Sequence, residues 1–145
     1  MAPLRQIIPM RPEDEEQVRE IYQLCHPALS ARPPFWYFAH PTIVFILAGQ
    51  VAGFTSFTLT VMPGFGSTLY GMDVCVKPGF RGQGIADALH DMRLALGRGL
   101  GATTFMGVCN KNNIKMATIL RRAGAHVCLA TSDQDVLFVS PIKGA

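Results

Sequence analysis

Residues 74–86 read VCVKPGFRGQGIA, which combines the end of a strand, a glycine-spaced turn and the start of a helix. A β-rich run from Leu69 to Lys77 is stopped by Pro78-Gly79. The first N–H groups of a helix lack intrahelical partners and carry partial positive charge, so this arrangement predicts an anion site. The helix places four apolar residues on one predicted core face: Ile85, Leu89, Met92 and Leu96.

The turn itself has the residues that a pyrophosphate needs. Gly82 and Gly84 allow a positive φ and close backbone approach, and Arg81 adds a positive charge. The chain has no Lys-Ser or Lys-Thr pair, which excludes a P-loop, and the dinucleotide fingerprint fails at Asp87, where its third glycine should be. For this short motif alone, an ordinary glycine-rich turn remains the alternative.

Length and composition indicate one globular domain over residues 1–145, with 49% hydrophobic and 16% charged residues. The four cysteines are far apart, which favours reduced thiols in a cytoplasmic protein over a disulfide framework. We expect no metal site, because the four histidines are scattered, and no membrane span. The net charge of +3 is too diffuse to predict a nucleic-acid partner.

The expected order of elements is β-α-β-β-β-α-β-α-β-β. Strands are predicted at 4–10, 42–48, 51–61, 69–77, 102–109, 126–130 and 136–140, and helices begin near Pro12, Ile85 and Ile114. Acids near Pro12 are expected to serve the helix start rather than catalysis. The last helix is expected to have Asn113 as its N-cap and three residues facing inward: Ile114, Ala117 and Leu120. Segment 26–41, rich in proline and aromatic residues, is not assigned.

Two motifs together resemble the GNAT superfamily of N-acetyltransferases. The first is Arg81-x-x-Gly84-x-Ala86 after a strand that ends in Val-x-Pro, and the second is Asn113-x-x-Met116 with a glycine at 124. The resemblance covers nearly the whole chain. It implies an α/β (α+β) fold with a central mixed, mostly antiparallel twisted sheet of about seven strands flanked by helices. It also implies acetyl-CoA as cosubstrate, without a metal.

The resemblance further implies which residues hold acetyl-CoA. Backbone groups around Val74 and Val76 would face the pantetheine and the acetyl carbonyl, and Asn113 would bind the pantetheine arm or act purely as an N-cap. The aromatic segment suggests Trp36 and Tyr37 as substrate contacts, with a packing lid as the alternative. The loop residues expected to bind the pyrophosphate are Arg81, Gly82, Gln83, Gly84, Ile85 and Ala86.

The catalytic residues are less clearly marked. Asp73 is the first candidate for general base, because a carboxylate is costly in an apolar strand and an amine substrate would account for it. The alternative is an acid that is paired with neighbouring groups. Tyr70 is a second candidate, as acid or base. Many family members carry a Tyr seven residues after the Asn, and here that position is Leu120. Cys75 and Cys109 have no base nearby in sequence, which favours packing roles.

The predicted function is an acetyl-CoA-dependent N-acetyltransferase that moves an acetyl group to a primary amine by direct attack in a ternary complex. The acceptor is an amine on a small molecule or on a peptide or protein. One alternative is a catalytically degenerate CoA-binding sensor or interaction module of the same fold, and another is a nucleotide-binding module. By resemblance, the last hairpin is a possible homodimer surface.

Overall fold

The structure, a computed structural model, describes residues 4–26 and 39–143. Its strands are β1 (Arg5–Pro9), β2 (Thr42–Leu47), β3 (Gln50–Met62), β4 (Gly66–Val76), β5 (Thr104–Asn110), β6 (His126–Ala130) and β7 (Asp135–Pro141). Its helices are α1 (Glu15–Cys25), α3 (Ile85–Gly99) and α4 (Ile114–Arg122), with 3₁₀ turns η1 (Pro12–Asp14) and η2 (Pro78–Phe80). The described strands follow the sheet order β1-β2-β3-β4-β5-β7-β6, with β4 and β5 parallel. This confirms the predicted mixed sheet of seven strands.

Contacts divide the chain into two compact units, 1–56 with 73–90 and 57–72 with 91–145. In the first unit, β1 pairs antiparallel with β2, and β2 with β3. Ala48 and Gly49 have φ values of 51° and 79° between β2 and β3, as a tight hairpin turn requires at its two central residues. The strands predicted at 42–48 and 51–61 are therefore joined as a hairpin.

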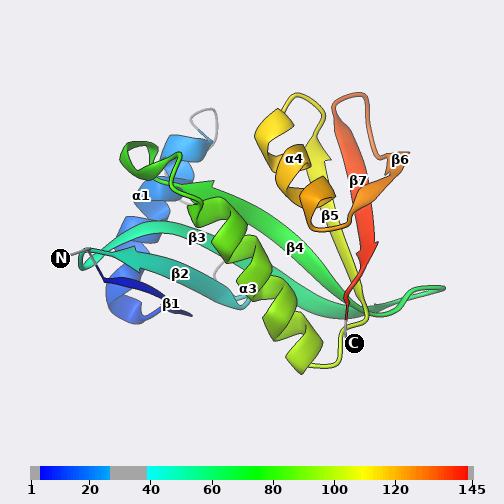
Figure 1. The fold of residues 1–145 in the computed structure, drawn as a ribbon, viewed down its shortest axis with the longest axis horizontal. Coiled ribbons are helices and arrows are strands. Elements are labelled where there is room, and N and C mark those ends of the chain that lie inside the picture. The colour runs from blue at the N-terminus through cyan, green and yellow to red at the C-terminus, as the bar shows by residue number, and fades with distance from the viewer. Residues whose placement is uncertain (1–3, 27–38, 144–145) are drawn as a thin grey trace. The chain divides into compact units, whose positions relative to one another are not determined.

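Helices cover both faces of the sheet in the first unit (Figure 1). On one face lies α1, which buries Val18, Ile21 and Tyr22, residues at the i, i+3, i+4 spacing of one helix face. On the other face, the first turns of α3 join a core of residues from β2, β3 and α3: Ile43, Phe45, Leu47, Ala52, Ile85 and Leu89. The end of β4 therefore lies between two helices, one on each side of the sheet.

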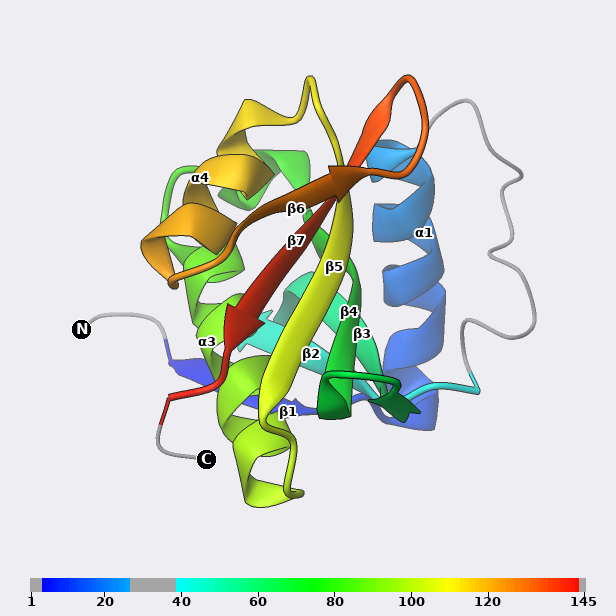
Figure 2. The same ribbon diagram turned by 90° about the vertical axis from the view of Figure 1, so that its right-hand side faces the viewer.

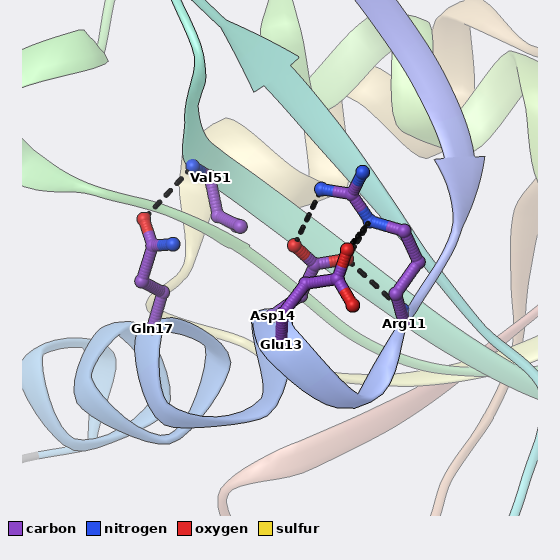
Figure 3. A network of polar contacts seen from close by, with 5 residues as sticks. All are labelled: Arg11, Glu13, Asp14, Gln17 and Val51. Atoms are coloured by element: carbon purple, nitrogen blue, oxygen red, sulfur yellow. Dashed lines mark hydrogen bonds and ion pairs between the residues drawn. The ribbon is translucent and has the colours of Figure 1, made fainter.

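The start of α1 is held by a polar network (Figure 3). Asp14 is buried, and its carboxylate accepts hydrogen bonds of 2.9 Å from the Arg11 backbone N–H and guanidinium. Gln17 accepts a 3.0 Å bond from the backbone N–H of Val51, which ties α1 to β3. The guanidinium lowers the pKa of the Asp14 carboxyl. The acids at this helix start thus include a structural one, as predicted.

In the second unit, β5, β7 and β6 lie side by side (Figure 2). The later turns of α3 differ from the prediction: Met92 and Leu96 are each 37% exposed, whereas Arg93 is buried. The buried face of α3 is shifted because glycines at positions 71 and 97 leave room beside it. A Cβ on Gly71 would lie 2.8 Å from the Arg93 guanidinium carbon, and one on Gly97 would collide with the Leu69 side chain.

The last helix begins at Ile114, as predicted, but its inward face differs from the prediction. Leu120 is buried in the core of the second unit and Ala117 packs against it, whereas Ile114 is 74% exposed. Ile114 is the first helical residue, and its side chain does not reach that core. Gly124 has a φ of 99° just after the helix, as its predicted place at the C-terminus requires.

Candidate functional site

The glycine turn has the backbone that its sequence predicts. Gly82 and Gly84 have φ values of 81° and 77°, in the region that favours glycine. A Cβ added at either position would meet nothing within 4 Å, so the conformation, not lack of space, requires glycine. The Ala88 N–H donates to the Gly84 carbonyl at 3.0 Å, and the N–H groups of the preceding residues lie before this first helical bond.

Arg81 is an exposed residue at the start of this turn, and its side chain is held by contacts with β4 and α1. Its Nε donates to the Val76 carbonyl at 3.2 Å, and its Nη2 lies 3.8 Å from the Sγ of Cys25. The guanidinium thus lies over the end of β4, next to the end of α1. The loop has a second cation that sequence reasoning missed: the Arg5 guanidinium lies 3.5 Å from both the backbone carbonyl and the side-chain oxygen of Gln83.

A glycine in β3 brings the strand end and the helix start together. A Cβ on Gly53 would lie 2.8 Å from the Cys75 carbonyl oxygen and 3.3 Å from Ile85. Val74 and Val76 pack against the same core. Their side chains are therefore engaged in packing, which leaves their backbone groups as the parts that could face a ligand.

Asp73 lies beside a histidine that the sequence analysis did not select. Its Oδ1 is 3.4 Å from Nε2 of His26, and the two side chains are 38% and 32% exposed. The same Nε2 lies 3.9 Å from the Sγ of Cys75. The Asp73 carbonyl accepts a 2.8 Å bond from the Thr55 hydroxyl, which fixes the strand at this point. No local pattern marks His26, because its partner Asp73 is 47 positions away in the sequence.

Two cysteines from separate elements meet beside this pair. Hydrogen bonding to Cys75 and to the Arg81 guanidinium, together with the charge of Arg81, lowers the pKa of Cys25 to about 6 against the effect of burial. Hydrogen bonding to Cys25, together with burial and the negative charges of Cys25 and Asp73, raises the pKa of Cys75. Cys75 is therefore the protonated partner.

The second unit holds two of the predicted site residues. Tyr70 is half-buried on β4, opposite Met106 of β5 in the parallel register. Asn113 caps α4, because its Oδ1 accepts a 3.1 Å bond from the Met116 N–H. The predicted substrate contacts Trp36 and Tyr37 lie outside the described residues.

Two other kinds of site are absent from the described residues. Within residues 4–26 and 39–143, no group of three or more His, Cys, Asp or Glu side chains is placed to hold a metal ion. No helix in the part of the chain that the structure describes is long and apolar enough to cross a membrane.

Comparison with known proteins places these features in a family. The sequence model of the acetyltransferase (GNAT) family matches residues 15–124, whereas no curated protein sequence matches. The fold is similar to Arabidopsis thaliana NAA60 in complex with a bisubstrate analogue, with a TM-score of 0.82, 16% identity and coverage of 98% of this chain and 100% of that one.

Two bacterial structures have the same fold. The Escherichia coli ribosomal-protein-S18-alanine N-acetyltransferase has a TM-score of 0.78 and 17% identity, over 98% of this chain and 96% of that one. The Salmonella typhimurium yncA protein, solved with its cofactor acetyl-CoA, has a TM-score of 0.77 and 19% identity, over 97% and 95%. With the family model matching most of its length, the chain belongs to the acetyltransferase (GNAT) family.

Proposed function

We propose that this protein is an acetyl-CoA-dependent N-acetyltransferase that transfers the acetyl group to a primary amine by direct attack in a ternary complex. The observation that carries the proposal is the turn at residues 81–84, which enters α3 through two glycines of positive φ within the region that the family model matches.

The proposed cofactor site combines backbone and side-chain donors. The first N–H groups of α3, with those of the turn, would bind the pyrophosphate of acetyl-CoA, and Arg81 would add a charge-assisted contact. Arg5 is a further candidate, since it already contacts Gln83. The yncA protein of Salmonella typhimurium has acetyl-CoA as its cofactor, which supports the choice of ligand.

The proposed chemistry needs a base for the amine and a leaving group that departs readily. Asp73, half-exposed and 3.4 Å from His26, would accept the amine proton directly or through that imidazole. A CoA thiol, with a pKa of about 8.5, leaves without a strong acid. Tyr70 remains the second candidate for proton transfer.

The acceptor that we propose to test first is the amino group of a peptide or protein. The Arabidopsis thaliana Naa50 complex contains CoA-Ac-MVNAL, a peptide bisubstrate analogue, and the Escherichia coli neighbour acts on ribosomal protein S18. Small-molecule amines belong in the same panel, because these neighbours share the fold at low identity.

The test joins calorimetric titration with a thiol-release assay. We expect micromolar binding of acetyl-CoA, no binding of NAD⁺, and thiol release with at least one amine. Asp73→Asn should lower kcat/KM by about 10²–10⁴-fold while acetyl-CoA still binds. Tyr70→Phe, run alongside, tests the second candidate. Full activity in both variants would remove both residues from the mechanism, and failure to bind acetyl-CoA would remove the function itself.

A second candidate function is a CoA-binding sensor that has lost transfer activity. The observation that favours it is Leu120, which is buried in the core of the second unit at the position where many family members have a Tyr. Binding of acetyl-CoA without thiol release across the whole amine panel would support this reading over the first.

A further inference from the structure

Cys25 and Cys75 are fifty positions apart in sequence, and the fold brings each Sγ within 4 Å of the residue that follows the other cysteine. Cys25 ends α1 and Cys75 lies near the end of β4. The Cys75 Sγ lies 3.9 Å from Nε2 of His26, the residue that follows Cys25. The Cys25 Sγ also lies 3.9 Å from the carbonyl of Val76, the residue that follows Cys75.

The surroundings of the two thiols differ in a way that suits redox chemistry. Cys25 is partly exposed and lies 3.8 Å from the Arg81 guanidinium, so a small oxidant can reach a stabilised thiolate. Cys75 is 2% exposed and has His26 Nε2 at 3.9 Å, a nitrogen that can take up its proton. One thiol is thus open and activated, and the other is enclosed with a base beside it.

Cys109 provides a comparison for Cys25, because its surroundings are those of a buried, packed thiol. It is buried, its thiol contacts the carbonyls of Asn110 and Asn113 at 3.4 and 3.7 Å, and burial raises its pKa. Neither of these contacts is a cation or a second thiol. The arrangement around Cys25 is therefore more than the packing of an apolar residue.

We propose that Cys25 and Cys75 form a redox pair that a hydroperoxide oxidises to an intramolecular disulfide. The Cys25 thiolate attacks the peroxide, which breaks the O–O bond, gives a sulfenic acid on Cys25 and releases hydroxide. The Cys75 sulfur then displaces the sulfenic hydroxyl as water, while the Cys75 proton passes by way of His26. In sum, two thiols and one hydrogen peroxide give one disulfide and two waters.

The lowered pKa of Cys25 agrees with this assignment, since a thiol with a pKa of about 6 is mostly thiolate at pH 7. The titratable and charged groups that face it are Cys75 and Asp73 on β4, His26 at the end of α1, and Arg81 in the turn. The pair does not depend on acetyl-CoA, so it stands or falls separately from the proposed function.

The experiment treats the reduced full-length protein with hydrogen peroxide in the presence of a chelator, which suppresses metal-catalysed oxidation. Remaining thiols are alkylated and the digest is analysed by mass spectrometry. We expect a linked pair of peptides containing Cys25 and Cys75, lighter by two hydrogens than the separate peptides, and reversed by dithiothreitol.

Four variants separate the roles of the residues. Cys75→Ala should accumulate a Cys25 sulfenic acid that dimedone traps, and Cys25→Ser should leave Cys75 reduced. Arg81→Gln should raise the pH midpoint of Cys25 alkylation. Cys128→Ser, which removes an exposed cysteine of β6, is the matched control and should leave the Cys25–Cys75 link unchanged. Circular dichroism checks that each variant is folded.

Two results would overturn the proposal. One is recovery of Cys25 and Cys75 as free thiols under conditions that oxidise Cys128. The other is oxidation of Cys25 in the wild-type protein to sulfinic acid, or its linkage to a different cysteine, without a bond to Cys75. Because the wild-type protein alone gives both readouts, a variant that fails to fold does not remove the test.

Discussion

The sequence predicts an acetyl-CoA contact at the start of α3 and also at the start of α4, with a pure N-cap as the alternative at Asn113, yet the two starts differ in structure. The residue before α4 is Asn113, whose side chain accepts a hydrogen bond from the third residue of the helix. The residue before α3 is Gly84, which has no side chain with which to accept one. A helix start that caps itself satisfies one of its own donors, whereas a start preceded by glycine leaves that donor for another acceptor.

The largest expected effect that tests this comparison comes from Gly84→Asp. The variant forces an aspartate into a φ of 77° and places a negative charge where the phosphate is expected. We expect the Kd for acetyl-CoA to rise by about 100-fold, measured by calorimetry. The matched control is Gly79→Ala, because Gly79 has no positive φ and its added Cβ would meet nothing within 4 Å. An unchanged Kd in Gly84→Asp would mean that the turn does not bind the cofactor.

The start of α1 is a third case for comparison. There the Asp14 carboxylate accepts hydrogen bonds from the backbone N–H and the guanidinium of Arg11. Asp14→Ala should lower the free energy of unfolding by about 1.5 kcal/mol near neutral pH, measured by urea denaturation. Because the folded pKa of Asp14 is lowered, its stabilisation is full above the unfolded value of about 3.9 and is lost as pH falls through the folded value. The difference between wild type and variant should therefore shrink below about pH 4.

The control for this measurement is Glu13→Ala, which removes a 66% exposed carboxylate that also faces Arg11. Its effect should stay below about 1 kcal/mol, because exposed ion pairs contribute little. Equal losses in both variants would show that the buried position of Asp14 has no special role.

The smallest effect is expected from Asn113→Ala. Loss of the cap should cost about 1 kcal/mol, which lowers the Tm by about 3 °C, and the Kd for acetyl-CoA should change less than about twofold. Asn112→Ala, one residue earlier, is the control for the Tm. A rise in Kd well above twofold would show that Asn113 binds the cofactor as well as capping the helix.

The fold was largely predictable because its signals are local. The hairpin at Ala48–Gly49, the glycine turn and the cap at Asn113 each depend on residues within a few positions of one another. The prediction that Met92 and Leu96 of α3 face the core was wrong, and the reason lies in tertiary packing. Arg93 is buried because Gly71 leaves space for it, the Met72 carbonyl accepts its 2.9 Å bond, and its guanidinium lies over the Phe105 ring at 5.1 Å.

The backbone of the glycine turn was predictable for the same reason. Arg81, Gly82 and Gly84 lie within four consecutive positions, and the two glycines have the positive φ that the motif predicts. The neighbours of Asp73 were not predictable, because His26 comes from an element 47 positions away and no pattern in the sequence pairs it with β4. Separate elements meet only in the folded chain, and the periodicity of each element alone carries no information about that contact.

The Arg81 guanidinium has two possible partners. One is the Cys25 sulfur, and the other, in the proposed function, is a phosphate of acetyl-CoA. Binding equilibria that share a group are thermodynamically linked, and the linkage is reciprocal. If acetyl-CoA draws Arg81 away, the Cys25 thiolate loses part of its stabilisation and reacts more slowly with peroxide. By the same factor, the thiolate form of Cys25 should bind the cofactor more weakly than the thiol form does, because the thiolate holds Arg81. The cofactor level would then set how readily an oxidant reacts with Cys25.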